Sequence, residues 1–205
     1  MAPIENFPSS SRRGLLVGLL SLTTLVCLGS CEPETPEVPI DDENPPTLGL
    51  GIGEARDISS FDLVAEMGVG WNLGNSFDVT ARDKTLWGNP APSFAMVTAV
   101  KAMGFGTIRI PITWGFHQQE NAPYTIEPGY LQEIETVVEH AFRNQMHVII
   151  NVHHDNDWVV PTAEAAEEAQ ARLASLWTQV ANHFIEYNDS LIFETLNEPR
   201  LEGIP

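Results

Sequence analysis

From about residue 66 onward, short runs rich in β-branched residues alternate with longer amphipathic segments. This alternation is typical of successive βα units that build a parallel sheet. Apolar residues at helical spacing predict one helix that Ser93 caps and that ends at Gly104, and two more around residues 131–141 and 173–184. The candidate strands are residues 67–71, 107–112, 147–152 and 191–196. The fold class predicted for this chain is therefore α/β.

The polarity of each strand position predicts the face of the sheet that it occupies, because alternate strand residues point to opposite sides. One parity is apolar and is expected to pack against the helices: Ile108, Ile110, Val148, Ile150, Val152, Leu191 and Phe193. The opposite parity holds Arg109, Asn151, His153, Glu194 and Glu198. Polar residues that gather toward the C-terminal ends of parallel strands are what the active site of a (β/α)8 barrel requires.

A doubly wound sheet is the competing architecture, but no glycine-rich nucleotide-binding loop follows the first candidate strand. We therefore predict an incomplete (β/α)8 TIM barrel with about four of the eight βα units. Residues 48–205 are interpreted as the N-terminal part of a larger domain, cut short by truncation, frameshift or fragmentary assembly. Such a piece would leave two free strand edges, which favour aggregation.

The charge balance of the chain restricts its partners. It holds 10 basic and 28 acidic residues, a net charge of -18, which repels phosphate backbones and argues against nucleic acid as a partner. The two cysteines, Cys27 and Cys31, both lie near the start, so no disulfide framework or cysteine metal cluster is expected in the domain. A soluble globular enzyme or binding domain is the class that remains.

The N-terminus has the layout of a secretory signal. Arg12 and Arg13 precede an apolar run at residues 15–28, which is shorter than the roughly 20 residues of a membrane-spanning helix. The sequence LGSC that ends at Cys31 resembles the lipobox of bacterial lipoproteins, which implies that Cys31 is acylated and anchors the protein in a membrane. The alternative is ordinary cleavage near Ser30, which would leave Cys31 as a free thiol.

The segment after Cys31 is rich in proline and acidic residues and cannot bury enough apolar surface to fold. We therefore divide the chain into a signal peptide at residues 1–30, an acidic Pro-rich tether at residues 31–47 and a domain at residues 48–205. Acidic residues directly after the cysteine also resemble the surface-export signals of some Gram-negative lipoproteins. This resemblance implies a place on the outer membrane or the cell surface.

Four ordered segments lie at the predicted strand ends: GVGWNLGNSFD at 68–78, GFGTIRIPITW at 104–114, VIINVHHDNDW at 148–158 and LIFETLNEPR at 191–200. Together they resemble glycoside hydrolase family five, whose members are retaining enzymes on a (β/α)8 barrel. Within that family they resemble the subgroup of endo-β-1,4-glucanases that includes xyloglucan- and mixed-linkage-glucan-cleaving members. The resemblance implies an enzyme that cleaves internal β-1,4 bonds of a β-glucan polysaccharide without a cofactor.

The resemblance also implies roles for Asn197 and Glu198. Glu198 would be the general acid/base, and Asn197 would hydrogen-bond the 2-hydroxyl of the sugar. A retaining glycosidase needs two carboxyl groups about 5 to 5.5 Å apart, and burial beside the second one would keep Glu198 protonated. In the family the nucleophile is a second glutamate on the seventh strand, so we expect the 205 residues alone to be inactive.

Arg109 lies in mid-strand on the inward parity, where an unpaired cation would be costly, and Glu194 is the expected partner. The alternative is an arginine that extends to the surface from an edge strand. The resemblance implies that Arg109 orients the catalytic centre and that His153 contacts the sugar near the acid/base. His154 is expected to contact the substrate or to support a residue that does.

The His153-His154 pair, followed by Asp155 and Asp157, also suggests a metal site. Adjacent strand residues face opposite ways, so both imidazoles should not reach one ion, and we predict no metal. We expect an active homologue to be unaffected by chelators. A (β/α)8 metallohydrolase is the alternative.

Tryptophans at the predicted strand ends are candidates for stacking on the apolar faces of sugar rings. They are Trp71, Trp87, Trp114 and Trp158, and we expect two or more of them to line a cleft, although each one alone could equally belong to the core. Asn72 and Asn75 flank the same mouth, whereas Trp177 keeps helical spacing and is assigned to the core.

An alternative function and alternative substrates stay open. A non-catalytic glycan-binding surface lipoprotein would keep the tryptophans and the tether but would use Glu198 only as a hydrogen-bond partner. Mannan and xylan are alternative substrates, because loops set the specificity of a barrel enzyme.

Overall fold

The computed structural model describes residues 49–199. The predicted signal peptide, the anchor at Cys31 and the tether lie outside the described residues. In chain order the elements are α1 Ser60–Met67, β1 Gly70–Asn72, α2 Phe94–Ala102, β2 Thr107–Ile110, the 3-10 helix η1 Gly115–His117, α3 Pro128–Arg143, β3 His147–Asn151, α4 Ala166–His183 and β4 Leu191–Glu194.

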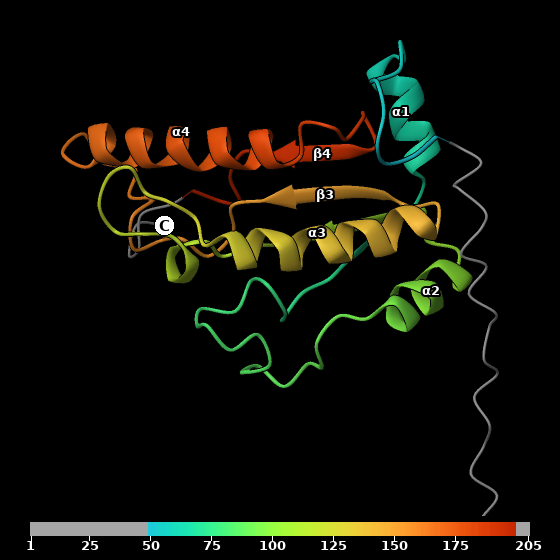
Figure 1. The fold of residues 1–205 in the computed structure, drawn as a ribbon, viewed down its shortest axis with the longest axis horizontal. Coiled ribbons are helices and arrows are strands. Elements are labelled where there is room, and N and C mark those ends of the chain that lie inside the picture. Colours follow the sequence, from blue (N-terminus) through green and yellow to red (C-terminus); the bar gives the residue numbers. More distant parts are fainter. Residues whose placement is uncertain (1–48, 200–205) are drawn as a thin grey trace, which may run out of the picture. The chain divides into compact units, whose positions relative to one another are not determined.

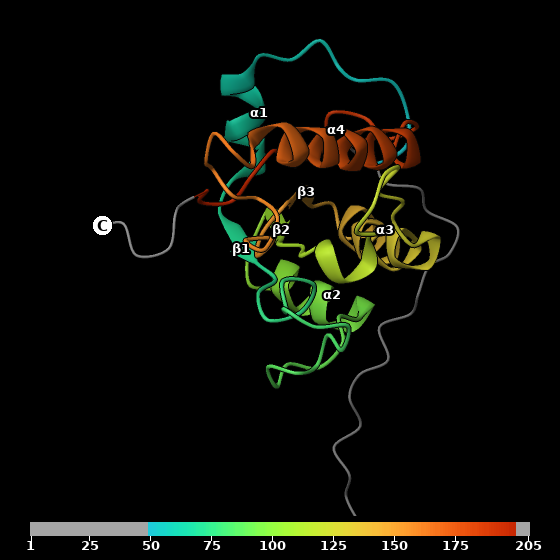
Figure 2. The same cartoon turned by 90° about the vertical axis from the view of Figure 1, so that its left-hand side faces the viewer.

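The strands form one parallel sheet in the order β1-β2-β3-β4, and each connection between neighbours passes through a helix. Figure 1 shows α3 and α4 running alongside β3 and β4. In the turned view, α2, α3 and α4 follow one another around the strands on one side (Figure 2). The α/β class and the parallel order of the four strands are as predicted.

Local sequence explains where the helices begin and end. The Ser93 side chain accepts a hydrogen bond from the Met96 N–H, which caps α2 as expected. The helix ends just before Gly104, whose φ of 96° lies in the region that favours glycine. Pro128 stands in the first turn of α3, where a missing N–H costs nothing.

The core lies between the sheet and the helices. Ile108, Ile110, Val148 and Ile150 are all 0% exposed, which confirms the parity that predicted them to face the helices. Phe193 was expected on the same buried face but is 40% exposed. It lies on β4, an edge of the described sheet, where no further strand covers it.

Trp71 also belongs to the helix-facing side of the sheet. It lies opposite Ile108 in the register of β1 and β2, and it packs against the hydrophobic core. Paired residues of parallel strands point to the same face, so Trp71 points away from the polar side of the sheet. The prediction that Trp71 binds substrate is therefore wrong.

The helix α1 was not predicted, and the strand expected at residues 67–71 begins three residues later, at Gly70. Ser59 caps α1 by accepting from the Asp62 N–H. The segment before α1 is held by Arg56, which makes ion pairs with Glu66 at 2.9 Å and with Asp189 at 2.7 Å. These contacts join the chain before β1 to the turn before β4.

Gly106 is required where α1 meets the start of β2. A Cβ atom at this residue would lie 2.4 Å from the Met67 carbonyl oxygen, a backbone atom that cannot rotate away. We expect Gly106→Ala to lower the free energy of unfolding by about 1–3 kcal/mol, as overpacking does. Urea denaturation of the chain measures this change.

Gly129→Ala is the matched control for that variant, because a Cβ atom at Gly129 meets nothing within 4 Å. Alanine within a helix is favoured over glycine, so this control should be neutral or stabilising by roughly 0.5–1 kcal/mol. Equal effects of the two substitutions would show that the close approach at Gly106 does not constrain the fold.

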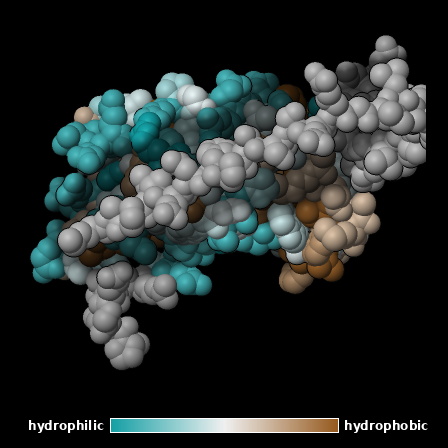
Figure 3. Space-filling view, turned by 90° about the horizontal axis from the view of Figure 1, so that it is seen from below, coloured by the Kyte–Doolittle hydropathy of each residue, from teal (hydrophilic) through white to brown (hydrophobic). Residues whose placement is uncertain are grey.

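One face of the described chain is largely polar (Figure 3). On the face seen in Figure 3 hydrophilic residues cover most of the described area, and a hydrophobic area lies at the right-hand end. Within residues 49–199, none of the helices combines the length and the apolar character that crossing a lipid bilayer demands.

Candidate active site

Arg109 is the centre of a polar network at the C-terminal ends of the strands. Its Nε and Nη2 atoms donate to the two carboxylate oxygens of Glu194, both at 2.7 Å. Nη1 donates to the Asn72 side-chain oxygen at 3.0 Å, and Nη2 also donates to the Asn197 oxygen at 3.1 Å. The pairing with Glu194 is confirmed, and the alternative of an arginine that extends to the surface is wrong.

The charges of this pair stabilise each other. The Glu194 carboxylate raises the pKa of Arg109, and the Arg109 guanidinium lowers the pKa of Glu194. Glu194 is therefore ionised at neutral pH with both oxygens engaged. A bidentate pair fixes the plane of the guanidinium, so Arg109 presents its remaining N–H groups in fixed directions.

Asn151 extends the network to His153. Its side chain is fully buried and donates to Glu194 Oε1 at 3.2 Å, with His153 Nδ1 3.1 Å from the same nitrogen. Burial, together with the positive charges of His154 and Arg109, lowers the pKa of His153 to about 4. His153 is therefore a neutral imidazole beside an ion pair at neutral pH.

Glu198 lies at the exposed rim of this network. The backbone N–H of the preceding Asn197 donates to the Val152 carbonyl at 2.8 Å, which holds the segment after β4 against the end of β3. Glu198 is close enough to Arg109 for its charge to contribute to the raised pKa of that guanidinium. The burial that was expected around Glu198 is absent, because Glu198 is exposed in the described part of the chain.

The backbone of Glu198 has a positive φ of 33°. Residues other than glycine that are held in such sparsely populated conformations cost about 1–3 kcal/mol and cluster at functional sites. This strain supports a functional role for Glu198.

A cluster of Asp78, His153 and His154 lies beside the network. One potential ligand atom of each lies within 4.8 Å of the others, so the argument that both imidazoles cannot approach one ion is wrong. The alternation of faces applies within a strand, and β3 ends at Asn151. Nδ1 of His153 is, however, already occupied by the Asn151 amide. The inertness to chelators stays a prediction.

Trp87 lies at the exposed mouth of the site, next to His154. Trp87 is 41% exposed, and its ring meets the edge of the His154 ring at 5.8 Å between centroids. Asn75 is exposed in the loop after β1, with a φ of 58°. Trp87 is therefore the tryptophan best placed at the mouth.

Trp114 is 0% exposed, and its indole N–H donates to the Asn151 carbonyl at 2.9 Å. The prediction that Trp114 binds substrate is therefore wrong, because its ring is enclosed in the core.

Trp158 is half-buried, and its indole N–H donates to the buried Asp155 at 3.1 Å. The Arg172 guanidinium lies 4.6 Å from the centre of the Trp158 ring. Trp177 packs against the core, as assigned.

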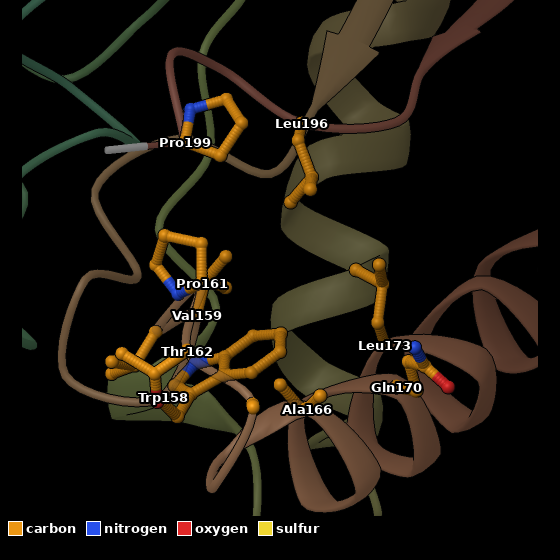
Figure 4. Close-up of a pocket in the computed structure, with 12 residues that line it drawn as sticks. Trp158, Val159, Pro161, Thr162, Ala166, Gln170, Leu173, Leu196 and Pro199 are labelled. Atoms are coloured by element: carbon orange, nitrogen blue, oxygen red, sulfur yellow. The ribbon is translucent and has the colours of Figure 1, made fainter. Parts of the chain in front are cut away.

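Trp158 also lines an apolar groove of about 410 Å³ between the loop after β3, the start of α4 and the segment after β4. Figure 4 shows its indole projecting toward Ala166 and Leu173, with Leu196 and Pro199 across the groove. A hydroxyl-rich ligand needs several polar partners, and these gather around Arg109 rather than here. The groove therefore adjoins the candidate site and is not its chemical centre.

Three residues with defined contacts at the site were not predicted to have a role: Asp78, Asn151 and Asp155. Strand parity assigned Asn151 to the polar face of the sheet, and this was the one sequence feature that pointed to a role for it. Asp155 is buried and accepts hydrogen bonds from the backbone N–H groups of Trp114 and Gly115, so it joins the loops after β2 and β3. Burial raises the pKa of Asp155.

This arrangement can support proton transfer at one position. Glu198 is an exposed carboxyl group whose charge acts on the Arg109 guanidinium, whereas the Glu194 carboxylate is committed to Arg109. Asp78 is only 5% exposed, and one of its oxygens accepts the Ser76 N–H. At this rim Glu198 is thus an accessible carboxyl group, whereas Asp78 is buried and Glu194 is paired with Arg109.

Comparison with known proteins identifies relatives with the same arrangement of elements. Residues 67–205 match the family model described as Cellulase (glycosyl hydrolase family 5). Endoglucanase B of Clostridium cellulovorans is 47% identical over 148 residues, which cover 72% of this chain and 33% of that protein.

Two solved structures share the fold. ZgEngAGH5_4 in complex with a cellotriose is 48% identical, with a TM-score of 0.73, over 75% of this chain and 46% of that one. A broad specificity endoglucanase from Ruminococcus champanellensis with bound cellotriose is 37% identical, with a TM-score of 0.72, over 75% and 47%. The chain thus spans less than half the length of the relatives it matches, and its sheet corresponds to part of a (β/α)8 barrel.

Proposed function

Because the chain belongs to the cellulase family, glycosyl hydrolase family 5, we propose that it forms the acid/base half of a retaining endo-β-1,4-glucanase. The observation that carries this proposal is the network in which Arg109 joins Glu194, Asn72 and Asn197 beside Glu198. Glu198 is the group that protonates the leaving glycosidic oxygen and afterwards activates water.

The neighbours of Glu198 have separate tasks in this mechanism. Asn197 accepts from Arg109 through its side-chain oxygen, which leaves its amide N–H groups to donate to a sugar hydroxyl. His153 contacts the sugar as a neutral ring, and Arg109 fixes the positions of Asn72 and Asn197. The nucleophile must come from a second carboxylate about 5 to 5.5 Å from Glu198, which we propose belongs to the other half of the barrel.

The proposed substrate is a β-1,4-linked glucan: cellulose, xyloglucan or mixed-linkage glucan. Two relatives have been solved with bound cellotriose, and curated relatives are named endoglucanases. Trp87 at the mouth, with 41% of its surface exposed, is the proposed stacking surface for a sugar ring, and His154 supports it by its edge contact. Asn75 and Trp158 are proposed as further contacts along the cleft.

The function is tested with two proteins. One is the 205-residue chain; the other, here called the chimera, joins residues 49–199 to the part of ZgEngAGH5_4 that follows the aligned segment. We expect the chimera to release reducing sugar from β-glucan and the 205-residue chain to show no turnover. Turnover by the 205-residue chain alone would contradict the proposal that the second catalytic carboxylate belongs to the other half of the barrel. Binding of cello-oligosaccharide by the chimera without hydrolysis would favour a glycan-binding protein.

We also propose that Cys31 is acylated and that the protein is a lipoprotein of the outer membrane or cell surface in a Gram-negative bacterium. The support is the LGSC sequence and the acidic tether after it. Expression in a Gram-negative host with labelled palmitate should label the wild-type chain and not the Cys31→Ser variant. Equal labelling of both, or of neither, would contradict the anchor.

A further inference from the structure

The contacts of Asn151 determine which way its side-chain amide points. The residue is 0% exposed at the end of β3. The Ile112 backbone N–H lies 3.1 Å from its Oδ1, and the Glu194 carboxylate lies 3.2 Å from its Nδ2. A backbone N–H only donates and an ionised carboxylate only accepts, so both partners require the same orientation of the amide.

This orientation has a consequence for His153. The Asn151 NH2 group also lies 3.1 Å from His153 Nδ1. Because that group only donates, the Nδ1 atom must accept and carries no proton. In a neutral imidazole the single proton then resides on the other nitrogen, Nε2.

We propose that Asn151 is a positioning residue that holds His153 in the tautomer with its proton on Nε2, so that the ring offers an N–H donor to an oxygen of the substrate. The substrate part of this inference rests on the proposed glucanase function, whereas the tautomer is a property of the protein alone. With the proton on Nδ1, Nε2 would instead be an acceptor. It could then bond only to a sugar hydroxyl that donates its own proton.

The charges around His153 keep it in one state over a wide pH range. Burial and the positive charges of His154 and Arg109 oppose protonation, while Asp78 and Glu194 favour it, and the balance lowers the pKa to about 4. Above that pH the ring is neutral, so the donor at Nε2 is present without an added charge. A charged imidazolium would instead compete with Arg109 for Glu194.

The tautomer also bears on the metal question. A metal ion at His153 would need an unprotonated nitrogen that is free of other contacts, and Nδ1 is held by Asn151. The amide of Asn151 thus biases His153 toward hydrogen bonding to a ligand and against coordination of an ion.

The experiment is long-range proton–nitrogen NMR on the 205-residue chain with labelled histidine, at neutral pH. The His153 signals are assigned from their loss in His153→Gln. We expect Nδ1 of His153 to show the shift of an unprotonated nitrogen and Nε2 that of a protonated one. The reverse assignment, or a charged ring at neutral pH, would overturn the proposal without any measurement of activity.

A variant tests the role of Asn151. In Asn151→Asp the new carboxylate accepts at the same place, so we expect the proton to move to Nδ1 and the pKa of His153 to rise by about 1–3 units. His183 is the internal control, because its Nε2 contacts Glu135 in a separate network and its signals should not move. Unchanged His153 signals in a folded variant would show that Asn151 does not set the tautomer. If the variant fails to fold, the wild-type assignment alone decides.

The two proposals fail in different ways. Protonated Nε2 in the wild-type chain together with an inactive chimera would remove the glucanase function and leave the tautomer standing. An active chimera together with a proton on Nδ1 would leave the function and remove the role of Asn151.

Discussion

Replacing Glu198 by glutamine in the chimera should lower kcat/KM on β-glucan by about 10²–10⁴-fold, the range expected for a general acid/base. Glutamine keeps the shape of the side chain and its exposed position but cannot give or take the proton. Reducing-sugar release measures the loss, and binding of cello-oligosaccharide should change little because the substitution is isosteric.

Glu54→Gln is the control for that variant, since Glu54 is exposed and lies before α1, away from the site. It should leave kcat/KM unchanged. A substrate with a good leaving group needs no acid for the first bond cleavage, so the first step with Glu198→Gln should be less impaired on an aryl cellobioside. Nearly full activity of Glu198→Gln on β-glucan would remove Glu198 from the reaction.

Arg109→Met should lower the activity of the chimera by about 10²-fold or more, because small displacements of positioning groups have effects of this size. The substitution also leaves Glu194 without the guanidinium that binds both of its oxygens. Unfolding free energy should fall by about 1–3 kcal/mol, the cost of an unsatisfied partner in a half-buried site. Activity assays and urea denaturation measure the two effects.

Glu194→Gln completes a double-mutant cycle with Arg109→Met. Removing both charges leaves no unpaired ion, so the double variant should be more stable than the sum of the two single losses implies, by about 0.5–3 kcal/mol. Activity should stay low in the double variant, because Asn72 and Asn197 have still lost their donor. Additive stability effects would contradict a coupled pair, and full turnover in Arg109→Met would separate Arg109 from the site.

Strand parity predicted much of the site. It placed Arg109 and Glu194 on one face and Ile108 and Ile110 on the other, and the register of the sheet agrees. Within a strand the two faces alternate strictly, so one sequence determines both the core and the polar surface. The ion pair between residues 85 positions apart followed from this rule and from the cost of an unpaired charge.

The same rule fails where the strand stops. Trp114 lies four residues beyond the end of β2, where the chain turns and encloses the indole. His154 lies beyond β3, so its ring can approach the ring of His153, with 4.3 Å between the centroids. Loop conformation depends on contacts with other loops, such as those that Asp155 makes, and one sequence does not display those contacts.

The role of residues that position another side chain could not be predicted from the sequence either. Asn151 could be placed on the polar face, but its hydrogen bond to Ile112 depends on the approach of the loop after β2. The helix α1 has eight residues, fewer than the window of about 11 to 18 residues over which helical periodicity is recognised, so its apolar spacing could not predict it. Strand parity predicted that Phe193 is buried, but Phe193 lies on β4 at an edge of the described sheet. The exposure of a side chain there depends on neighbours outside its own strand.

The central claim is that Arg109, His153 and Glu198 converge on a bound β-glucan at one rim of the barrel. A crystal structure of the Glu198→Gln chimera with cellotriose or a longer cello-oligosaccharide tests it most directly. We predict a sugar ring within hydrogen-bond distance of the His153 Nε2 and the Asn197 amide, with residue 198 facing the glycosidic oxygen. A sugar bound away from Arg109, His153 and Glu198, with these three side chains pointing to different faces of the sheet, would contradict the account.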